Sequence, residues 1–290
     1  MIRPPVFDFA SLDGLAFAAE RGRFNGRALP RMAAQGLGPI LELAQLADAG
    51  LLPAPEKAGW LALDGFEVLY RMLLTERSQW VCADGRRIGF LRTGAQPPKN
   101  ETGWISFCLA AQQAASMAGF PTRIAQQLIA AIGELRSNVY EHSRSATTGL
   151  IAFRAGTSSF EFVVGDRGVG VLQSLRTCTE FEGISDYGEA LKLALTEGVS
   201  RFGSKAGRGY GFRPIFIGLA NVRGYLRFRS GDHSLIIDGT RPSLTTARPP
   251  QKPMMSGFIV SVSCNAEVRS SRCSERPILR LTASRHRDSR

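Results

Sequence analysis

The stretch PTRIAQQLIAAIGELRSNVYEHS (residues 121–143) decides the fold, because its apolar residues recur every three or four positions, as in an amphipathic helix. The positions that share the side expected to pack on a sheet are Leu128, Ile132, Leu135 and Val139. Glu134 and Asn138 are four residues apart and share another face of the same helix. A carboxylate beside a carboxamide suits water activation and Mg²⁺ ligation, respectively. Taken alone, however, a pair of this kind is more often part of a solvated polar stripe on the helix surface.

A second informative stretch is FVVGDRGVGV (162–171), in which a predicted strand ends at Asp166 and is followed by Gly168 and Gly170. An aspartate at this position can accept a hydrogen bond from an exocyclic amine, and glycines let a flat base approach the backbone. Seen alone, the same stretch favours an ordinary turn at the end of a strand.

A third stretch, GSKAGRGYGF (203–212), is rich in glycine and in basic residues. It is not a Walker loop, because the serine–lysine order at 204–205 is reversed. It is not a Rossmann fingerprint either, because the third glycine of Gly207-x-Gly209-x-Gly211 comes one residue early and a helix is predicted before it. Backbone amides ahead of a helix can bind anionic oxygens, and a glycine-rich surface turn explains the stretch alone equally well.

In this order and spacing, the three stretches resemble motifs of the GHKL superfamily of ATP-binding domains, which includes gyrase-type topoisomerases, heat-shock chaperones, histidine kinases and MutL proteins. Residues 134–138 resemble the N box, 166–170 the G1 box and 207–212 the G2 box. The resemblance covers about residues 104–264. It implies a Bergerat-type ATP-binding fold with ATP and a magnesium ion (Mg²⁺) as ligands.

The resemblance also implies a role for each matching residue. Glu134 would be the general base, Asn138 would coordinate the Mg²⁺ that bridges the phosphates, and Asp166 would accept a hydrogen bond from the adenine amino group. The glycines that give room beside the base would be Gly168 and Gly170. The glycines of a lid that closes on the phosphates would be Gly207, Gly209 and Gly211. Charge and position add two contacts to the γ-phosphate, Lys205 and Arg208.

Two positions depart from the family pattern. Phe212 stands where leucine is usual, and Ser256-Gly257-Phe258 stands where many members have Gly-Thr, which would remove a threonine contact to phosphate or adenine. No histidine precedes His142, so histidine autophosphorylation is not expected. The helix pair within 106–143 is similar to the anti-sigma-factor type of serine/threonine kinase, which implies a regulatory protein partner of the anti-anti-sigma type and is compatible with a homodimer.

The predicted fold class is α+β, a two-layer sandwich with helices on one face of a largely antiparallel sheet. The expected parts are a mixed α/β regulatory or partner-docking domain of unknown fold at 1–95, a linker at 96–103, the ATP-binding domain at 104–264 and a basic, flexible tail at 265–290. The elements predicted before the linker are a strand at 6–9, helices within 31–52 and 66–76, and a hairpin at 79–91. The elements predicted after it include helices within 104–119, 121–143 and 187–200, a hairpin within 148–166, another at 225–239 and a strand at 257–264.

Composition argues against a nucleic-acid-binding, membrane-spanning, secreted or disulfide-bonded protein. The net charge is +11, but residues 265–290 carry seven arginines against three acidic residues, which is typical of a solvated tail, so nucleic acid is not an expected partner. No apolar run is long enough for a membrane span, and prolines and acidic residues interrupt the start of the chain, so we expect a cytoplasmic protein without a signal peptide. The five cysteines are scattered, which argues against disulfides and zinc.

Three functions remain open at this point. The first is a regulatory enzyme that uses ATP, either an ATPase or a serine/threonine protein kinase. The second is a nucleotide-gated protein-binding module with little turnover, and the third is a nucleic-acid-associated ATPase, which the charge alone favours. Glu134 favours the first, because a module that only binds has no need of a general base.

Overall fold

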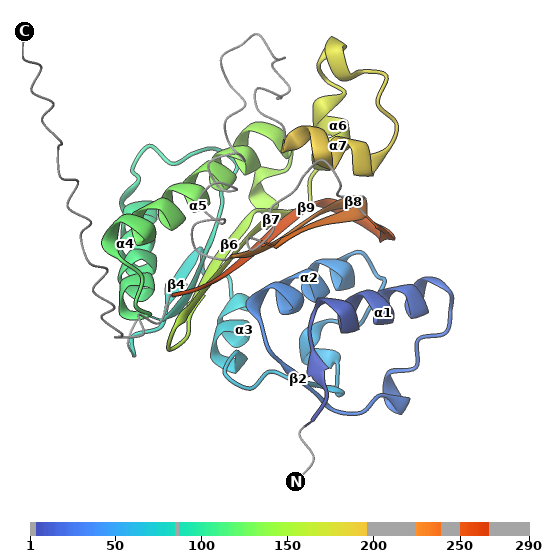
Figure 1. Ribbon diagram of the computed structural model, residues 1–290, viewed down its shortest axis with the longest axis horizontal. Helices are drawn as coiled ribbons and strands as arrows, with labels where there is room; N and C mark the ends of the chain where they lie inside the picture. The colour runs from blue at the N-terminus through green and yellow to red at the C-terminus, as the bar shows by residue number, and fades with distance from the viewer. Residues whose placement is uncertain (1–3, 85–86, 196–223, 239–249, 267–290) are drawn as a thin grey trace, which may run out of the picture.

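The computed structural model describes residues 4–84, 87–195, 224–238 and 250–266 of the 290-residue chain. In these ranges the protein is α+β and contains a parallel three-stranded sheet and an antiparallel six-stranded sheet (Figure 1). The larger sheet positions the candidate site.

The parallel sheet lies in the N-terminal part of the chain and has the order β1-β2-β3, made by β1 (Val6–Phe7), β2 (Met32–Ala34) and β3 (Leu61–Ala62). Its helices are α1 (Phe9–Glu20), α2 (Leu37–Asp48) and α3 (Glu67–Leu73). The sequence predicted α2 and α3 but missed α1, whose first turn is capped by the Asp8 carboxylate accepting from the Ser11 N–H at 2.9 Å. Residues 32–34 are a strand rather than the start of the helix predicted within 31–52.

The six-stranded sheet has the order β4-β5-β6-β7-β9-β8, with every neighbouring pair antiparallel. Its strands are β4 (Gln79–Val81), β5 (Ile88–Arg92), β6 (Leu150–Ala155), β7 (Ser159–Asp166), β8 (Tyr225–Asp238) and β9 (Gln251–Asn265). The hairpins predicted at 79–91 and within 148–166 are confirmed. Because β5 pairs with β6, this sheet uses strands from both sides of the expected linker at 96–103.

Strand β8 corrects one prediction. Residues 225–239 were predicted as a hairpin around a Ser-Gly-Asp turn, but residues 225–238 form one strand that pairs with β9. Gly231 has a φ of 62° and lies at a register shift, where Ser230 pairs with Phe258 and Gly231 pairs with Met255. The glycine therefore makes a bulge in a continuing strand and not a reversal.

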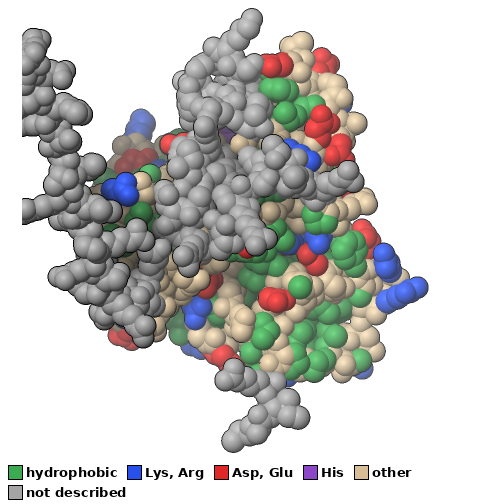
Figure 2. Space-filling model, in the orientation of Figure 1, with side chains coloured by type: hydrophobic (Ala, Val, Ile, Leu, Met, Phe, Trp, Pro, Cys, Tyr) green, Lys and Arg blue, Asp and Glu red, His purple; other side chains and the backbone are tan. Residues whose placement is uncertain are grey.

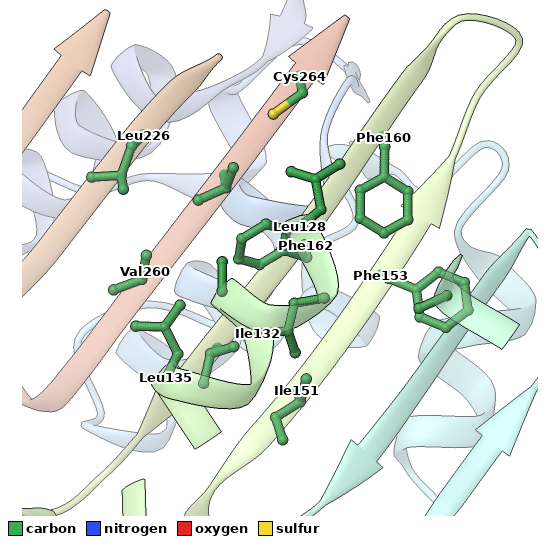
Figure 3. Packing of buried hydrophobic residues seen from close by; sticks show 14 of the residues in the cluster. Leu128, Ile132, Leu135, Ile151, Phe153, Phe160, Phe162, Leu226, Val260 and Cys264 are labelled. Carbon is green, nitrogen blue, oxygen red and sulfur yellow. The ribbon is translucent and has the colours of Figure 1, made fainter. Parts of the chain in front are cut away.

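Helices α4 (Thr102–Met117) and α5 (Thr122–His142) cover one face of this sheet, as predicted for residues 104–264 (Figure 1). Gly119, with a φ of 93°, allows the turn between them. The four apolar residues predicted to face the sheet from α5 are all buried, and each contributes roughly 1.5–3 kcal/mol. Figure 3 shows Ile132 and Leu135 over Ile151, Phe162 and Val260 of the sheet.

The opposite face of the same sheet is covered by the N-terminal segment, which the sequence did not predict. Side chains from α1, α2 and α3 form a second core together with Phe90, Val163 and Ile259 of the sheet. The alternation along β7 explains this, because Phe162 and Val164 face α5 whereas Val163 faces α2.

A buried group of charged residues joins the N-terminal segment to β8. Arg227 donates to the Glu42 carboxylate at 2.8 Å and to Asp13 of α1 at 2.7 Å, and Arg229 also donates to Glu42. Burial opposes ionisation of Glu42, but the charges and hydrogen bonds of the two guanidinium groups outweigh it and lower its pKa from 4.5 to about 2. The ionised carboxylate therefore holds α2 against the sheet.

The short helices α6 (Gly170–Leu175) and α7 (Tyr187–Ala194) lie beside α5 at one end of the sheet (Figure 1). Acidic side chains gather over these helices in Figure 2, although the chain as a whole is basic. None of the helices in the described ranges combines the length and apolar character of a membrane span.

Candidate functional site

The structure describes five of the residues for which the sequence predicted roles: Glu134, Asn138, Asp166, Gly168 and Gly170. The others lie outside the described residues, and their roles stay predictions. They are Lys205, Gly207, Arg208, Gly209 and Gly211.

Asp166 is the last residue of β7 and lies opposite Phe258 of β9. Strand alternation turns its side chain to the same face as Phe162 and Val164, which is the face that α5 covers. The side chain is almost fully enclosed, since the residue is 1% exposed. A carboxylate in this position must obtain its hydrogen bonds from the protein or from a ligand.

Only one oxygen of the Asp166 carboxylate has a hydrogen-bond donor within the described residues. The Gly168 N–H donates to Oδ1 at 2.7 Å, whereas Oδ2 is buried without a partner there. Burial raises the pKa of this carboxyl from 3.8 to about 7, and the Gly168 hydrogen bond offsets part of the rise. The group therefore has one oxygen that is fixed by a donor and one buried oxygen that has no donor in the described residues.

The two glycines after Asp166 are required for close packing of the turn. A Cβ at Gly168 would collide with the carbonyl oxygen of Ser143 at the end of α5, which also accepts from the Val169 N–H at 2.9 Å. Gly170 has a φ of 75°, and a Cβ there would lie 2.7 Å from the Ser230 hydroxyl oxygen. The turn is thus fixed against α5 on one side and against β8 on the other; a contact of these glycines with a base stays a prediction.

Glu134 and Asn138 lie on the flank of α5 that faces away from α4. Arg136 marks the α4 side, because it stacks on Trp104 at 4.5 Å from the ring centroid, and it is about 200° from Glu134 around the helix. Glu134 is exposed, and Asn138 is half-buried with an Nδ2 that has no partner in the described parts of the chain.

The flank that carries Asn138 continues toward the Asp166 turn. His142 is four residues further along α5, and its Nδ1 lies 3.2 Å from the Ser174 hydroxyl of α6. Helix α6 begins at Gly170, so α5, the turn and α6 are in direct contact. The structure therefore brings Asn138 and Asp166 to the same side of the sheet, and their sharing of one ligand site stays a prediction.

Two further residues, Gln45 and Ser230, support the turn, and sequence reasoning gave neither of them a role there. The Gln45 amide of α2 donates to the backbone oxygen of Asp166 at 2.5 Å and to that of Ser256 at 3.0 Å. The Ser230 hydroxyl accepts from the Val171 N–H at 3.0 Å and donates to the Gly257 carbonyl at 2.7 Å. Gln45 has no local signal, because its contact is 121 residues away in sequence.

Gly257 lies where β9 approaches the end of β7 most closely. Its φ is 71°, and a Cβ there would collide with the backbone oxygen of Asp166. The position that follows Ser256 in β9 therefore needs glycine so that the two strands can meet at the site.

A cavity of about 310 Å³ lies under the same turn, between α2, α3 and the sheet. It is lined by Val163 and Ile259, so it lies on the face opposite to the Asp166 carboxylate. Arg167 pairs with Asp48 at 2.6 Å beside it, which ties the turn to α2. Asp166 also lines this cavity, where its backbone oxygen accepts from the Gln45 amide, while strand alternation places its carboxylate on the face that α5 covers.

The residues around Asp166 are compatible with a Mg²⁺ site that a bound nucleotide completes. No group of three or more His, Cys, Asp and Glu side chains that could hold a metal is found in the described residues. A Mg²⁺ ion shared with nucleotide phosphates needs only one or two protein oxygens, and the amide oxygen of Asn138 is a suitable one.

Comparison with protein-family models found no match, and comparison with curated proteins found none either. The assignment of a function therefore depends on the chemistry of the residues around Asp166.

Proposed function

We propose that this chain binds Mg-ATP beside Asp166 and is a regulatory protein of the GHKL, histidine kinase-like ATPase type with a Bergerat-type fold. The observation that carries the proposal is the Asp166 carboxylate, buried with Oδ1 fixed by Gly168 and Oδ2 without a donor in the described residues. A buried acceptor without a donor is unfavourable, so a ligand N–H at Oδ2 would be stabilising. The adenine amino group is a donor of this kind.

Two features of the surrounding fold support the proposal. Helices α4 and α5 lie on one face of an antiparallel sheet, and the N-box and G1-box residues lie on that same side. The glycines after Asp166 are held in a turn of fixed shape by α5 and β8, which gives the ligand a preorganised surface.

In this proposal each residue acts on a different part of the nucleotide. Asp166 selects the base, and the amide oxygen of Asn138 would hold the Mg²⁺ that neutralises the phosphate charge. Glu134, one helical turn before Asn138, would accept the proton of the attacking water or of a serine or threonine hydroxyl on a protein partner. The result would be hydrolysis of ATP or phosphorylation of that partner.

The experiment that tests ligand binding is calorimetric titration of a non-hydrolysable ATP analogue with Mg²⁺. Asp166→Asn should weaken binding about 10- to 100-fold, since it removes a charge-assisted hydrogen bond worth roughly 1.5–3 kcal/mol. The matched control is Asp64→Asn, at an exposed aspartate, which should bind like the wild type. Equal affinity of folded wild type and Asp166→Asn would refute the adenine contact.

A separate measurement tests the chemistry. Glu134→Gln should retain nucleotide binding and lose phosphate release from ATP, whereas Glu182→Gln, at another exposed glutamate, should retain both. Undiminished turnover by Glu134→Gln would show that another group is the base.

A further inference from the structure

A second hollow lies in the N-terminal segment, away from the residues assigned to the nucleotide. Two loops line it, one within residues 24–31 between α1 and β2 and the other within residues 53–60 before β3. Its volume is about 620 Å³, within the range of sites that hold small molecules.

The charge of this hollow is entirely positive. Arg27, Arg31 and Lys57 line it, and no aspartate or glutamate does among the residues that the structure describes. All three basic residues are exposed, and none of them forms an ion pair with another described residue. Three cations without a carboxylate among them create a positive potential that favours an anionic ligand.

The wall of the hollow also contains a buried polar atom that lacks a partner. Trp60 is 4% exposed, and its Nε1 is enclosed without a hydrogen-bond acceptor in the described residues. The ring is held in place by packing on Phe7, with 5.5 Å between ring centroids. Its Nε1 edge faces Gly26, another lining residue, where an added Cβ would lie 3.3 Å from Nε1.

The indole N–H and the three cations are all donors, so the oxygens of a bound molecule must be acceptors. A phosphate offers several acceptor oxygens and a negative charge, and the rings of Phe24 and Trp60 offer contact to an apolar or flat body. Nε1 lies beside the lining residue Gly26, and the hollow has the volume of a small-molecule site, so we expect a small molecule as its occupant and not a duplex or a membrane surface. We infer that this hollow binds a small phosphorylated molecule with a flat or apolar body.

The test uses phenyl phosphate, which carries one phosphate and one ring and lacks the amino group that Asp166 would bind. Its binding to the full chain is followed by calorimetry, with phenol as the uncharged comparison. The wild type and Asp166→Asn should both bind phenyl phosphate saturably at millimolar concentration, and neither should bind phenol. Absence of saturable binding to the folded wild type, or equal binding of phenol, would overturn the inference.

A filling variant locates the binding without changing any charge. A Cβ at Gly59 would meet no atom within 4 Å, so Gly59→Leu extends a side chain into open space at the hollow. The matched control is Gly14→Leu, at an exposed glycine of α1 that is equally open. Gly59→Leu should lose at least about tenfold in affinity and the control should not, because only the first removes room for the ligand. Equal affinities would place the ligand elsewhere.

Charge variants distinguish binding in this hollow from attraction of the ligand by the net positive charge of the chain. Replacing Arg31 and Lys57 by alanine should lower affinity at least about tenfold, whereas replacing Arg21 and Arg23, which do not line the hollow, should have little effect. Trp60→Phe keeps a ring but removes the N–H, and should weaken binding severalfold. Equal losses of affinity in the two double variants would show that only the net charge of the chain matters and would contradict the inferred site. If the variant without Arg31 and Lys57 bound duplex DNA less well than the wild type, and neither of these two proteins bound phenyl phosphate, the hollow would be a nucleic-acid surface and the inference would be wrong.

Discussion

Replacing Asp166 by asparagine should make the stability of the chain less dependent on pH. In the folded protein, burial raises the pKa of this carboxyl from 3.8 to about 7, so the folded state binds its proton more tightly than the unfolded state does. The free energy of unfolding of the wild type therefore falls as pH rises from about 4 to about 7, because the buried group must ionise. Asparagine has no such ionisation.

The size of the effect follows from the two pKa values. At about 1.4 kcal/mol per pKa unit, the full cost of ionising Asp166 in the folded state is about 4 kcal/mol above pH 7. Between pH 5.5 and pH 8.5 the cost increases by about 2 kcal/mol. The buried Nδ2 that asparagine introduces at the place of Oδ2 adds a cost that does not vary with pH, so it cancels from the difference.

The assay is denaturant unfolding at both pH values, followed by tryptophan fluorescence, for the wild type and for Asp166→Asn. The free energy of unfolding of the variant relative to wild type should increase by about 2 kcal/mol from pH 5.5 to pH 8.5. Asp64→Asn, at an exposed position, should show no such change. The same relative stability of Asp166→Asn at both pH values would show that Asp166 ionises normally and that its environment in the fold is not the one described.

Other perturbations give separate expectations. Affinity for Mg-ATP should fall as pH drops below about 7, because protonated Asp166 no longer accepts a hydrogen bond from the adenine amino group. Titrations of the wild type at pH 6 and pH 8 measure this change. Asp166→Asn should show no such change. Glu42→Gln should destabilise the fold by roughly 3–5 kcal/mol, because it leaves the buried guanidinium groups of Arg227 and Arg229 without their counter-charge, and Asp13→Asn should destabilise it less. Thermal unfolding compares the two variants. Equal destabilisation would contradict the inference that Glu42 is the main partner of these two arginines. Gly170→Ala should cost roughly 1–3 kcal/mol in denaturant unfolding, since a side chain at this positive φ is strained and collides with neighbours, whereas Gly14→Ala, with open space around it, should be neutral or stabilising.

The predictions that the structure confirms depend on local periodicity. The apolar positions of α5 recur with helical spacing, so the buried face of this helix followed from the sequence alone. The hairpin predicted at 79–91 likewise contains strands β4 and β5. Gly231 misled the prediction, because a glycine in a bulge and a glycine in a turn have the same local sequence signal.

The features that the sequence missed depend on contacts between distant residues. Nothing near Glu42 indicates a partner 185 residues away in Arg227, so the packing of α2 on the sheet could not be predicted. For the candidate site, the sequence placed Asp166 at the end of a strand, which the structure confirms, but its one hydrogen-bond donor among the described residues and its support by Gln45 required the fold.

The order of strands in the large sheet has a consequence for how the chain folds during synthesis. Strand β9 lies between β7 and β8 in the sheet, although it is the last of the described strands to be synthesised. Until residue 265 has left the ribosome, β7 lacks one neighbour and α2 lacks part of the surface that it covers. Such long-range pairing slows folding, and we expect neither core to reach its final packing before β9 is inserted.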